Sequence, residues 1–234
     1  MNFAVMQPYF MPYIGYFQLI NAVDKFIIYD NIEFTKKGWI NRNRILVNGK
    51  PQYFTVNINK GSDYALIKER SISPVFEKNR RKILAQIEAN YRQAPYYKET
   101  LQLIQKCLEC NESCLFQFIF SSIQNIVSYL DIETELIASS SLNIDHSLKN
   151  KYKLWAMGDY LGVKNYVNPQ GGHDLYHKDE FREHGLNLSF HQSHLTPYSQ
   201  TGANEFFPAL SIIDILMNLG REGARQQLDD YILV

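Results

Sequence analysis

The stretch FAVMQPYFMPYIGYFQLINAVDKFIIYDN, residues 3–31, decides the fold class. Residues 3–6 and 25–29 are short apolar runs that end in polar residues, which is typical of buried strands. Between them, Pro12 stands where a helix can begin, so the sequence predicts a helix over residues 13–22. A strand, a helix and a second strand form a right-handed unit when the strands are parallel. This opening segment therefore indicates an α/β protein.

The rest of the chain continues the alternation and adds two features. Asn48-Gly49-Lys50-Pro51 is a turn sequence between strand-like residues 44–48 and 52–57, which predicts a β-hairpin. Apolar residues at spacings of three and four predict a helical block, over residues 74–90, 95–109 and 112–130. A second alternation follows, with strands over residues 135–138, 165–168 and 186–190 and helices over residues 148–161 and 208–219. We predict one α/β domain over residues 1–234, with a Rossmann-like, mostly parallel sheet and a helical insertion or subdomain over residues 74–130.

The balance of charge argues against two broad classes of protein. The chain carries 24 basic and 24 acidic side chains, whereas a protein that grips nucleic acid or anionic membrane over its whole surface needs a basic excess. No apolar stretch reaches the about 20 residues of a membrane span, and the amino terminus lacks the basic region of a signal peptide. We expect a cytoplasmic protein without a membrane partner. Its three cysteines fit a reducing compartment.

Positive charge is concentrated in residues 34–62, which hold six basic side chains and no acidic one. These are Lys36, Lys37, Arg42, Arg44, Lys50 and Lys60. Trp39, Asn41 and Asn43 interleave with them and offer a stacking face and amides beside guanidinium groups that fit phosphate or carboxylate. The combination indicates a nucleotide-linked or phosphorylated ligand. The alternative is a solvated hairpin around a core tryptophan.

Three polar loops follow predicted strands and would meet at the carboxyl edge of a parallel sheet, where ligands bind. They are Gln7-Pro8-Tyr9, Asp30-Asn31 and residues 168–172. Tyr9 and Tyr13 can line a sugar or base pocket, or belong to a rigid buried connector. The Gln7 amide needs partners because it follows a buried strand. In the third loop, the backbone amides of Gly171 and Gly172 can approach a phosphate or an oxyanion.

His173 follows the paired glycines, and histidine is the side chain most often used as a general base, so it is a candidate for that role, against the alternative of a solvated loop histidine. Five of the six histidines lie within residues 173–194, but neither His-Glu-x-x-His nor a pair of Cys-x-x-Cys motifs accompanies them, and we expect no metal site. The missing Walker loop and Gly-x-Ser-x-Gly elbow argue against an ATPase and a nucleophilic hydrolase. No cofactor is indicated.

Several long motifs resemble those of the WbqC-like protein family. They are Met6 to Phe17, Asp24 to Phe26, Tyr29 to Phe34, Lys36 to Ile45, Gly171-Gly172 with Leu175-Tyr176, Phe181 and Gly185, and Tyr198 to Gln200 with Leu210 to Gly220. The resemblance covers essentially the whole chain. It implies a bacterial protein of surface-polysaccharide biosynthesis, especially of the O-antigen of lipopolysaccharide, with a glycine transferase role proposed for some members. The position after the family's glycine pair varies, which moves weight from His173 to Asp30 as the general base.

Resemblance and residues together predict a transferase that moves glycine or a related acyl group onto the amino group of a nucleotide-linked amino sugar. The expected substrate-binding residues are Gln7, Tyr9, Tyr13, Lys36, Lys37, Trp39, Asn41, Arg42, Asn43, Gly171 and Gly172. Among them, Lys36, Lys37 and Arg42 would hold the diphosphate. Asp30 or His173 would accept the amine proton, while the Gly171-Gly172 amides stabilise the oxyanion. Without an ATP-binding loop, the expected donor is a glycyl-tRNA or a carrier-protein thioester.

Two other functions fit the same residues. One is a non-catalytic protein that binds a sugar nucleotide or a partner enzyme of the O-antigen pathway. The other is nucleotidyl transfer on a Rossmann-like scaffold, although residues 7–17 lack a histidine-rich phosphate signature. Substituting Asp30 or His173 would separate the transferase from the binding protein, because only an enzyme loses turnover while binding survives. The helical block is a candidate homodimer interface or lid.

Overall fold

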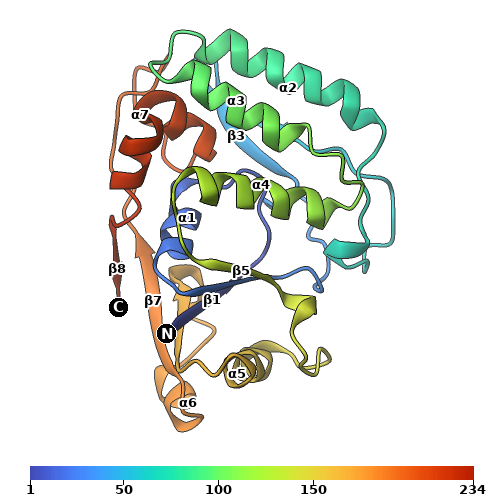
Figure 1. The fold of residues 1–234 in the computed structure, drawn as a ribbon, viewed down its shortest axis with the longest axis vertical. Helices are drawn as coiled ribbons and strands as arrows, with labels where there is room; N and C mark the ends of the chain where they lie inside the picture. The colour runs from blue at the N-terminus through green and yellow to red at the C-terminus, as the bar shows by residue number, and fades with distance from the viewer.

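A six-stranded sheet forms the centre of the computed structural model, which describes residues 1–234 (Figure 1). Its strands are β1 (Asn2–Met6), β2 (Lys25–Ile28), β5 (Glu135–Ala138), β6 (Asn165–Pro169), β7 (Asn187–Ser193) and β8 (Tyr231–Leu233), in the spatial order β5-β2-β1-β6-β7-β8. All neighbours pair in parallel except β7 and β8, which are antiparallel. The α/β class and the mostly parallel sheet are confirmed, whereas the edge strand β8 was not predicted.

Both faces of the sheet are covered, which explains why its strands are nearly continuous apolar runs. On β1, Phe3 and Val5 belong to one core cluster and Ala4 to the other, as expected for side chains that alternate across a strand. The smaller cluster is covered by α5 (Asn150–Leu161) and α6 (Lys178–Glu183), and the larger by α1 (Ile14–Asn21), α4 (Leu115–Tyr129) and α7 (Ile212–Gln226) (Figure 1). None of these helices has the length and apolar character needed to cross a bilayer.

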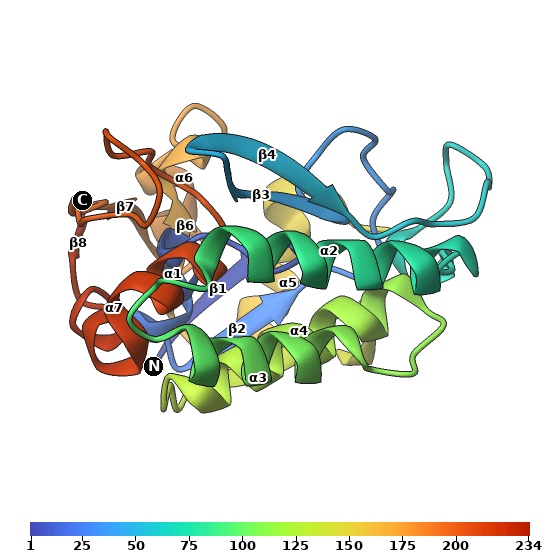
Figure 2. The ribbon, with the colours of Figure 1, turned by 90° about the horizontal axis from the view of Figure 1, so that it is seen from above.

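The chain between β2 and β5 forms a hairpin and a helical block. Its elements are β3 (Arg42–Val47), β4 (Lys50–Thr55), α2 (Val75–Tyr91), α3 (Tyr97–Leu108) and α4. The hairpin is antiparallel, with Val47 opposite Lys50 across the predicted turn. Figure 2 shows α2 between the hairpin and the α3–α4 pair. Buried side chains of the hairpin and of all three helices join the larger core cluster, so the block packs on the same core as α1 and α7.

The last helix begins at Ile212, later than predicted, and a second helical stretch follows Gly220. Its first residue follows Ser211, whose hydroxyl oxygen accepts a hydrogen bond from the Ile213 amide. Gly220 has a φ of 66°, which kinks the chain. A Cβ atom at this position would lie 2.5 Å from the Tyr96 ring. The glycine therefore ends the first helical stretch after residue 219, as predicted, and the chain turns past Tyr96 into a second stretch that reaches Gln226.

A buried carboxylate on α7 fixes the hairpin in place. Asp214 accepts hydrogen bonds from the hydroxyls of Tyr91 (2.7 Å) and Tyr198 (2.8 Å) and from the Gln200 amide (2.8 Å). The Tyr91 hydroxyl in turn accepts a bond from the Leu46 backbone amide on β3 at 2.9 Å. Burial raises the pKa of the Asp214 carboxyl. This network sets the distance between the hairpin and the carboxyl edge of the sheet, where a cavity opens.

Candidate ligand-binding cavity

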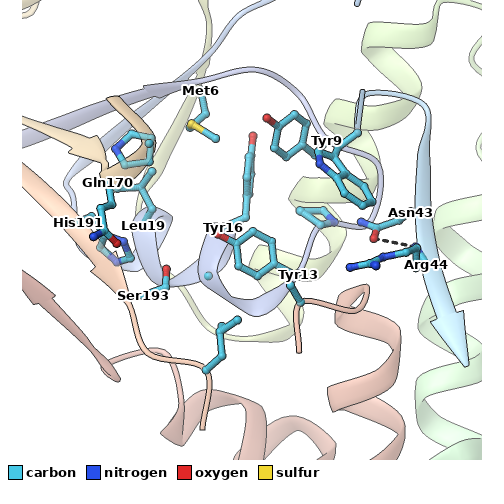
Figure 3. A pocket seen from close by; sticks show the side chains of 17 residues that line it. Met6, Tyr9, Tyr13, Tyr16, Leu19, Asn43, Arg44, Gln170, His191 and Ser193 are labelled. Carbon is cyan, nitrogen blue, oxygen red and sulfur yellow. Dashed lines mark hydrogen bonds between the residues drawn. The ribbon is translucent and has the colours of Figure 1, made fainter. Parts of the chain in front are cut away.

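A cavity of about 540 Å³ opens at the carboxyl edge of the sheet beside β1 and β6. The chain leads from β1 to β2 on one side and from β6 to β7 on the other, so the strand order reverses here. Open α/β sheets bind ligands at such a point, and the volume suits a small molecule. The lining comes from the ends of β1, β6 and β7, from α1 and the loop before it, and from the hairpin (Figure 3).

Three tyrosines from the segment around the start of α1 line one wall. Burial raises the pKa of Tyr9, Tyr13 and Tyr16, so all three are neutral phenols at neutral pH. The Tyr16 hydroxyl donates to the Gln7 carbonyl at 2.9 Å, and the Tyr16 ring lies 5.6 Å from that of Tyr9. The wall thus offers aromatic faces and uncharged hydroxyls, which suit a sugar or a base.

His191 lies near the end of β7 and also lines the cavity. Its side chain is only 2% exposed, and its Nε2 atom is buried without a hydrogen-bond partner in the protein. Burial lowers the pKa of His191 to about 4, so the imidazole is neutral at physiological pH. The ring stacks on Tyr231 at 4.5 Å, which fixes its orientation. The neutral, oriented ring nitrogen thus lacks a partner in the protein, in a residue that borders the cavity.

Arg44 is the one lining side chain that is charged at neutral pH, because the lining contains no lysine and no acidic residue and His191 is neutral. Its Nε atom is buried and has no hydrogen-bond partner in the protein, and no carboxylate lies within 4 Å of its guanidinium group. The guanidinium carbon lies 5.3 Å from the centre of the Trp39 ring. Figure 3 shows Arg44 across the cavity from His191 and Gln170. This arrangement suits the binding of an anion.

Two neighbouring features give the cavity its shape. The Asn43 amide donates to the carbonyls of Phe10 (3.2 Å) and Met11 (2.8 Å), and its oxygen accepts from the Arg44 backbone amide at 2.8 Å. Asn43 therefore ties the loop before α1 to the hairpin. A Cβ atom on Gly15 would lie 2.4 Å from the Tyr13 ring and 2.6 Å from the Ser193 hydroxyl. Only a glycine lets α1 pack this closely against β7.

The structure brings five of the predicted substrate-binding residues to the cavity, namely Tyr9, Tyr13, Trp39, Asn43 and Gly171. Gln7 and Asn41 are not in the lining. The Gln7 carbonyl holds Tyr16, as described above, and the Asn41 amide donates to the Val56 carbonyl at 2.9 Å, inside the hairpin. Gly172 packs against Asn168, whose Nδ2 atom would lie 1.8 Å from an added Cβ. These three positions shape the scaffold around the cavity.

The three cationic residues expected to hold a diphosphate lie outside the cavity. Lys36 is exposed and forms an ion pair with Asp63 at 2.5 Å. Lys37 is exposed. The Arg42 guanidinium donates to the Gly38 carbonyl at 3.0 Å and to the Lys37 carbonyl, and it lies 4.5 Å from the centre of the Tyr53 ring. Among the six basic residues of the segment, Arg44 is the one that reaches the cavity.

Asp30 and His173, the two expected bases, also lie away from the cavity lining. Asp30 is 3% exposed, and its carboxylate accepts from the Ser139 hydroxyl (2.8 Å), the Ser140 amide (2.8 Å) and the Ser140 hydroxyl (2.5 Å). It therefore joins the ends of β2 and β5. The His173 side chain is 68% exposed and lies 4.8 Å from Phe190, in a shallow surface hollow.

Among the polar lining residues, the expected site lacked Arg44 and four others, namely Tyr16, Gln170, His191 and Ser193. His191 directly follows the predicted strand 186–190, so its place at a strand end was a usable signal. Its burial could not be predicted from the neighbouring residues. Arg44 belongs to the predicted basic segment but is not among the predicted substrate-binding residues. Alternation along β3 puts Arg42 and Arg44 on one face, and only the tertiary packing shows which of them meets the cavity.

The protein is thus an α/β protein in which helices cover both faces of the sheet, and its cavity lies where the strand order reverses. The chain belongs to the WbqC-like protein family, whose family model matches residues 7–226. It is also 30% identical, over 223 residues, to the uncharacterized protein Rv1507c of Mycobacterium tuberculosis, a match that covers 94% of each chain. No solved structure matches the chain.

Proposed function

We propose that the protein is a cytoplasmic transferase of surface-polysaccharide biosynthesis that binds a nucleotide-linked amino sugar in this cavity and acylates its amino group with glycine or a related acyl group. One observation carries the proposal. An unpaired guanidinium group stands among neutral aromatic side chains, and an uncharged histidine with a free ring nitrogen faces it. The first feature suits the phosphates of the substrate, and the second suits an amine that must lose a proton.

The substrate's anionic group pairs with Arg44, whose planar fork matches two phosphate oxygens. Trp39 and Tyr9, on the same side of the cavity, stack on the base or the sugar. Because the lining holds no carboxylate, nothing repels the phosphates. A cavity of about 540 Å³ falls within the range of sites for ligands of this size.

The acyl transfer uses His191 in place of Asp30 and His173. The sugar amine attacks the carbonyl carbon of an activated glycyl ester or thioester, so a nitrogen–carbon bond forms and the bond to the leaving oxygen or sulfur breaks. The His191 Nε2 accepts the proton that the amine loses and returns it to the leaving group. Because its pKa is about 4, the imidazole is uncharged at neutral pH and keeps a lone pair on the ring. The Gln170 amide and the Gly171 backbone lie at the same edge and can donate to the oxyanion.

A thermal shift assay tests the substrate class. UDP-linked amino sugars with a free amino group are titrated into the wild-type protein, beside UDP-sugars that carry a hydroxyl at that position. Saturation at 100 times the dissociation constant adds about 2.7 kcal/mol of stability, which for this chain length raises the melting temperature by roughly 5–10 °C. The amine-bearing ligands should give the larger shift. A melting temperature that no nucleotide sugar changes would contradict the proposal.

Two alternative functions share this cavity and differ in outcome. A binding protein without activity would show the same thermal shifts, but incubation with glycyl-tRNA and the amino sugar would yield no N-glycylated product. A nucleotidyltransferase, which the position of the cavity at the reversal of strand order also suits, would release pyrophosphate from a nucleoside triphosphate and a sugar phosphate. Mass spectrometry of both reaction mixtures distinguishes the three functions.

A further inference from the structure

The hairpin carries a second feature, which extends from the cavity to the outer surface. We infer that this surface binds the single-stranded 3′ end of an RNA and leads it to the cavity, and that the acyl donor is therefore an aminoacyl-tRNA. The role as donor rests on the proposed function. The binding of RNA does not, because it depends only on the hairpin surface and can be measured without any reaction.

Four side chains form a continuous stack on the hairpin, with two rings between two guanidinium groups. The Arg42 guanidinium carbon lies 4.5 Å from the centre of the Tyr53 ring, and the Tyr53 ring centre lies 5.9 Å from that of Trp39 at an angle of 32°. The Arg44 guanidinium carbon follows, 5.3 Å from the centre of the Trp39 ring. Arg44 stands directly opposite Tyr53 in the register of β3 and β4. Two neighbouring aromatic rings thus lie between two guanidinium groups, and we call this set of four side chains the hairpin stack.

The hairpin stack runs from the surface into the cavity. Tyr53 is 52% exposed, and Tyr53 and Arg42 lie outside the cavity, whereas Trp39 and Arg44 line it. The Arg42 group is held by its bonds to the carbonyls of Lys37 and Gly38, so its plane is fixed over the tyrosine ring before any ligand arrives. A chain that follows the stack inward therefore ends at Arg44, opposite His191.

The charge of the surrounding segment supports an extended anion. Residues 34–62 hold six basic side chains and no acidic one. Lys37, Lys50 and Lys60 are exposed and have no carboxylate within 4 Å, and only Lys36 is paired, with Asp63. The chain as a whole is neutral. This local excess therefore gives the hairpin an attraction for phosphates that the rest of the surface lacks.

The combination of aromatic rings and guanidinium groups in the hairpin stack favours a nucleic acid over an acidic carrier protein. Single-stranded nucleic acids present a flat base and a phosphate in every repeat, and proteins bind them with exposed aromatic rings inside basic grooves. An acidic helix would satisfy the cations but has no flat group for Tyr53. A single strand is also thin enough to place its terminal ester inside the cavity, whereas a duplex hides its base faces.

Fluorescence anisotropy with a labelled eight-nucleotide RNA that ends in CCA tests the inference. We expect the wild type to bind this strand at 50 mM KCl and to bind a blunt RNA duplex of the same sequence more weakly. Tyr53→Leu, which removes the ring from an exposed position, should weaken binding about tenfold, whereas Tyr53→Phe should keep it. Arg42→Gln should weaken it similarly. Lys98→Gln on α3, also exposed, is the matched control and should bind as the wild type does.

The salt dependence of RNA binding tests the same surface independently. With two or three phosphate contacts, raising KCl from 50 to 200 mM should weaken binding roughly tenfold. Equal binding by the wild type and Tyr53→Leu, tighter binding of the duplex, or binding of an acidic acyl carrier protein in place of the RNA would each overturn the inference. Thermal shifts with UDP-amino sugars should be unchanged in Tyr53→Leu. Failure at the hairpin is thus separate from failure at the cavity.

Discussion

The carboxyl edge of the sheet has two halves, one at the ends of β2 and β5 and the other at the ends of β1, β6 and β7. Both halves carry polar side chains, but these side chains differ in their hydrogen bonding. At the ends of β2 and β5, the Asp30 carboxylate accepts three hydrogen bonds from Ser139 and Ser140. At the ends of β1, β6 and β7, the His191 Nε2 and the nearby Arg44 Nε are buried without protein partners. A buried polar group without a partner costs about 1–3 kcal/mol, a cost that a bound ligand can remove. We therefore propose that the first half is scaffold and that the second half binds the ligand.

The largest effect on turnover should come from substituting His191, at the ends of β1, β6 and β7. His191→Phe keeps a ring against Tyr231 but removes the proton acceptor, so turnover of glycyl transfer should fall 10²- to 10⁴-fold. Stability should not fall, because the variant also removes a buried atom that lacks a partner. Single-turnover assays with glycyl-tRNA and denaturant unfolding measure the two quantities. Turnover at the wild-type rate would place the base elsewhere.

The reverse pattern is expected in the first half. Asp30→Ala leaves the Ser139 and Ser140 donors without their acceptor, so the free energy of unfolding should fall by about 2–4 kcal/mol. The thermal shift produced by a UDP-amino sugar should persist. Asp145→Ala is a matched control, because that exposed carboxylate binds only Ser147 and its loss should cost less than about 0.5 kcal/mol. An Asp30 variant that keeps its stability but loses turnover would return this residue to the catalytic machinery.

Two glycines at the same edge extend the comparison. Gly15→Ala places a Cβ against Tyr13 and Ser193 and should lower stability by about 1–3 kcal/mol. Ligand affinity should fall with it, because the wall formed by Tyr13 moves. Gly171→Ala meets open space within 4 Å and should change stability by less than about 0.5 kcal/mol. Urea unfolding and titration of the sugar nucleotide distinguish the two, and equal losses in both variants would contradict the packing described here.

The smallest effect concerns Asp214, which holds the hairpin above the cavity. Burial raises its pKa in the folded protein above the unfolded value of about 4. The folded state therefore binds this proton more tightly, and the corresponding stability is lost as pH rises from about 4 through the folded pKa. Asp214→Asn does not titrate. Its stability relative to wild type should therefore improve between pH 4 and pH 7 in urea unfolding, whereas a constant difference would contradict a raised pKa.

The local sequence was sufficient to predict the α/β fold and part of the candidate site. The apolar runs at residues 3–6 and 25–29 predicted buried parallel strands because both faces of the sheet are covered. The roles at the edge were harder to predict, because the partners of Asp30 lie about 109 residues away at Ser139 and Ser140. The same holds for Arg42 and Arg44, which share one face of β3. Contacts between residues distant in sequence decide which of these side chains is hydrogen-bonded within the protein and which can bind a ligand.

The central claim is that Arg44, and not the outer basic residues, anchors the ligand in the cavity. Isothermal titration of a UDP-amino sugar into Arg44→Gln and Arg42→Gln tests it directly, because the two arginines lie two residues apart on the same strand. We predict that Arg44→Gln weakens binding about 10- to 100-fold, as loss of hydrogen bonds to a charged group does, while Arg42→Gln binds like the wild type. Equal affinities in the two variants, or a loss confined to Arg42→Gln, would contradict the account.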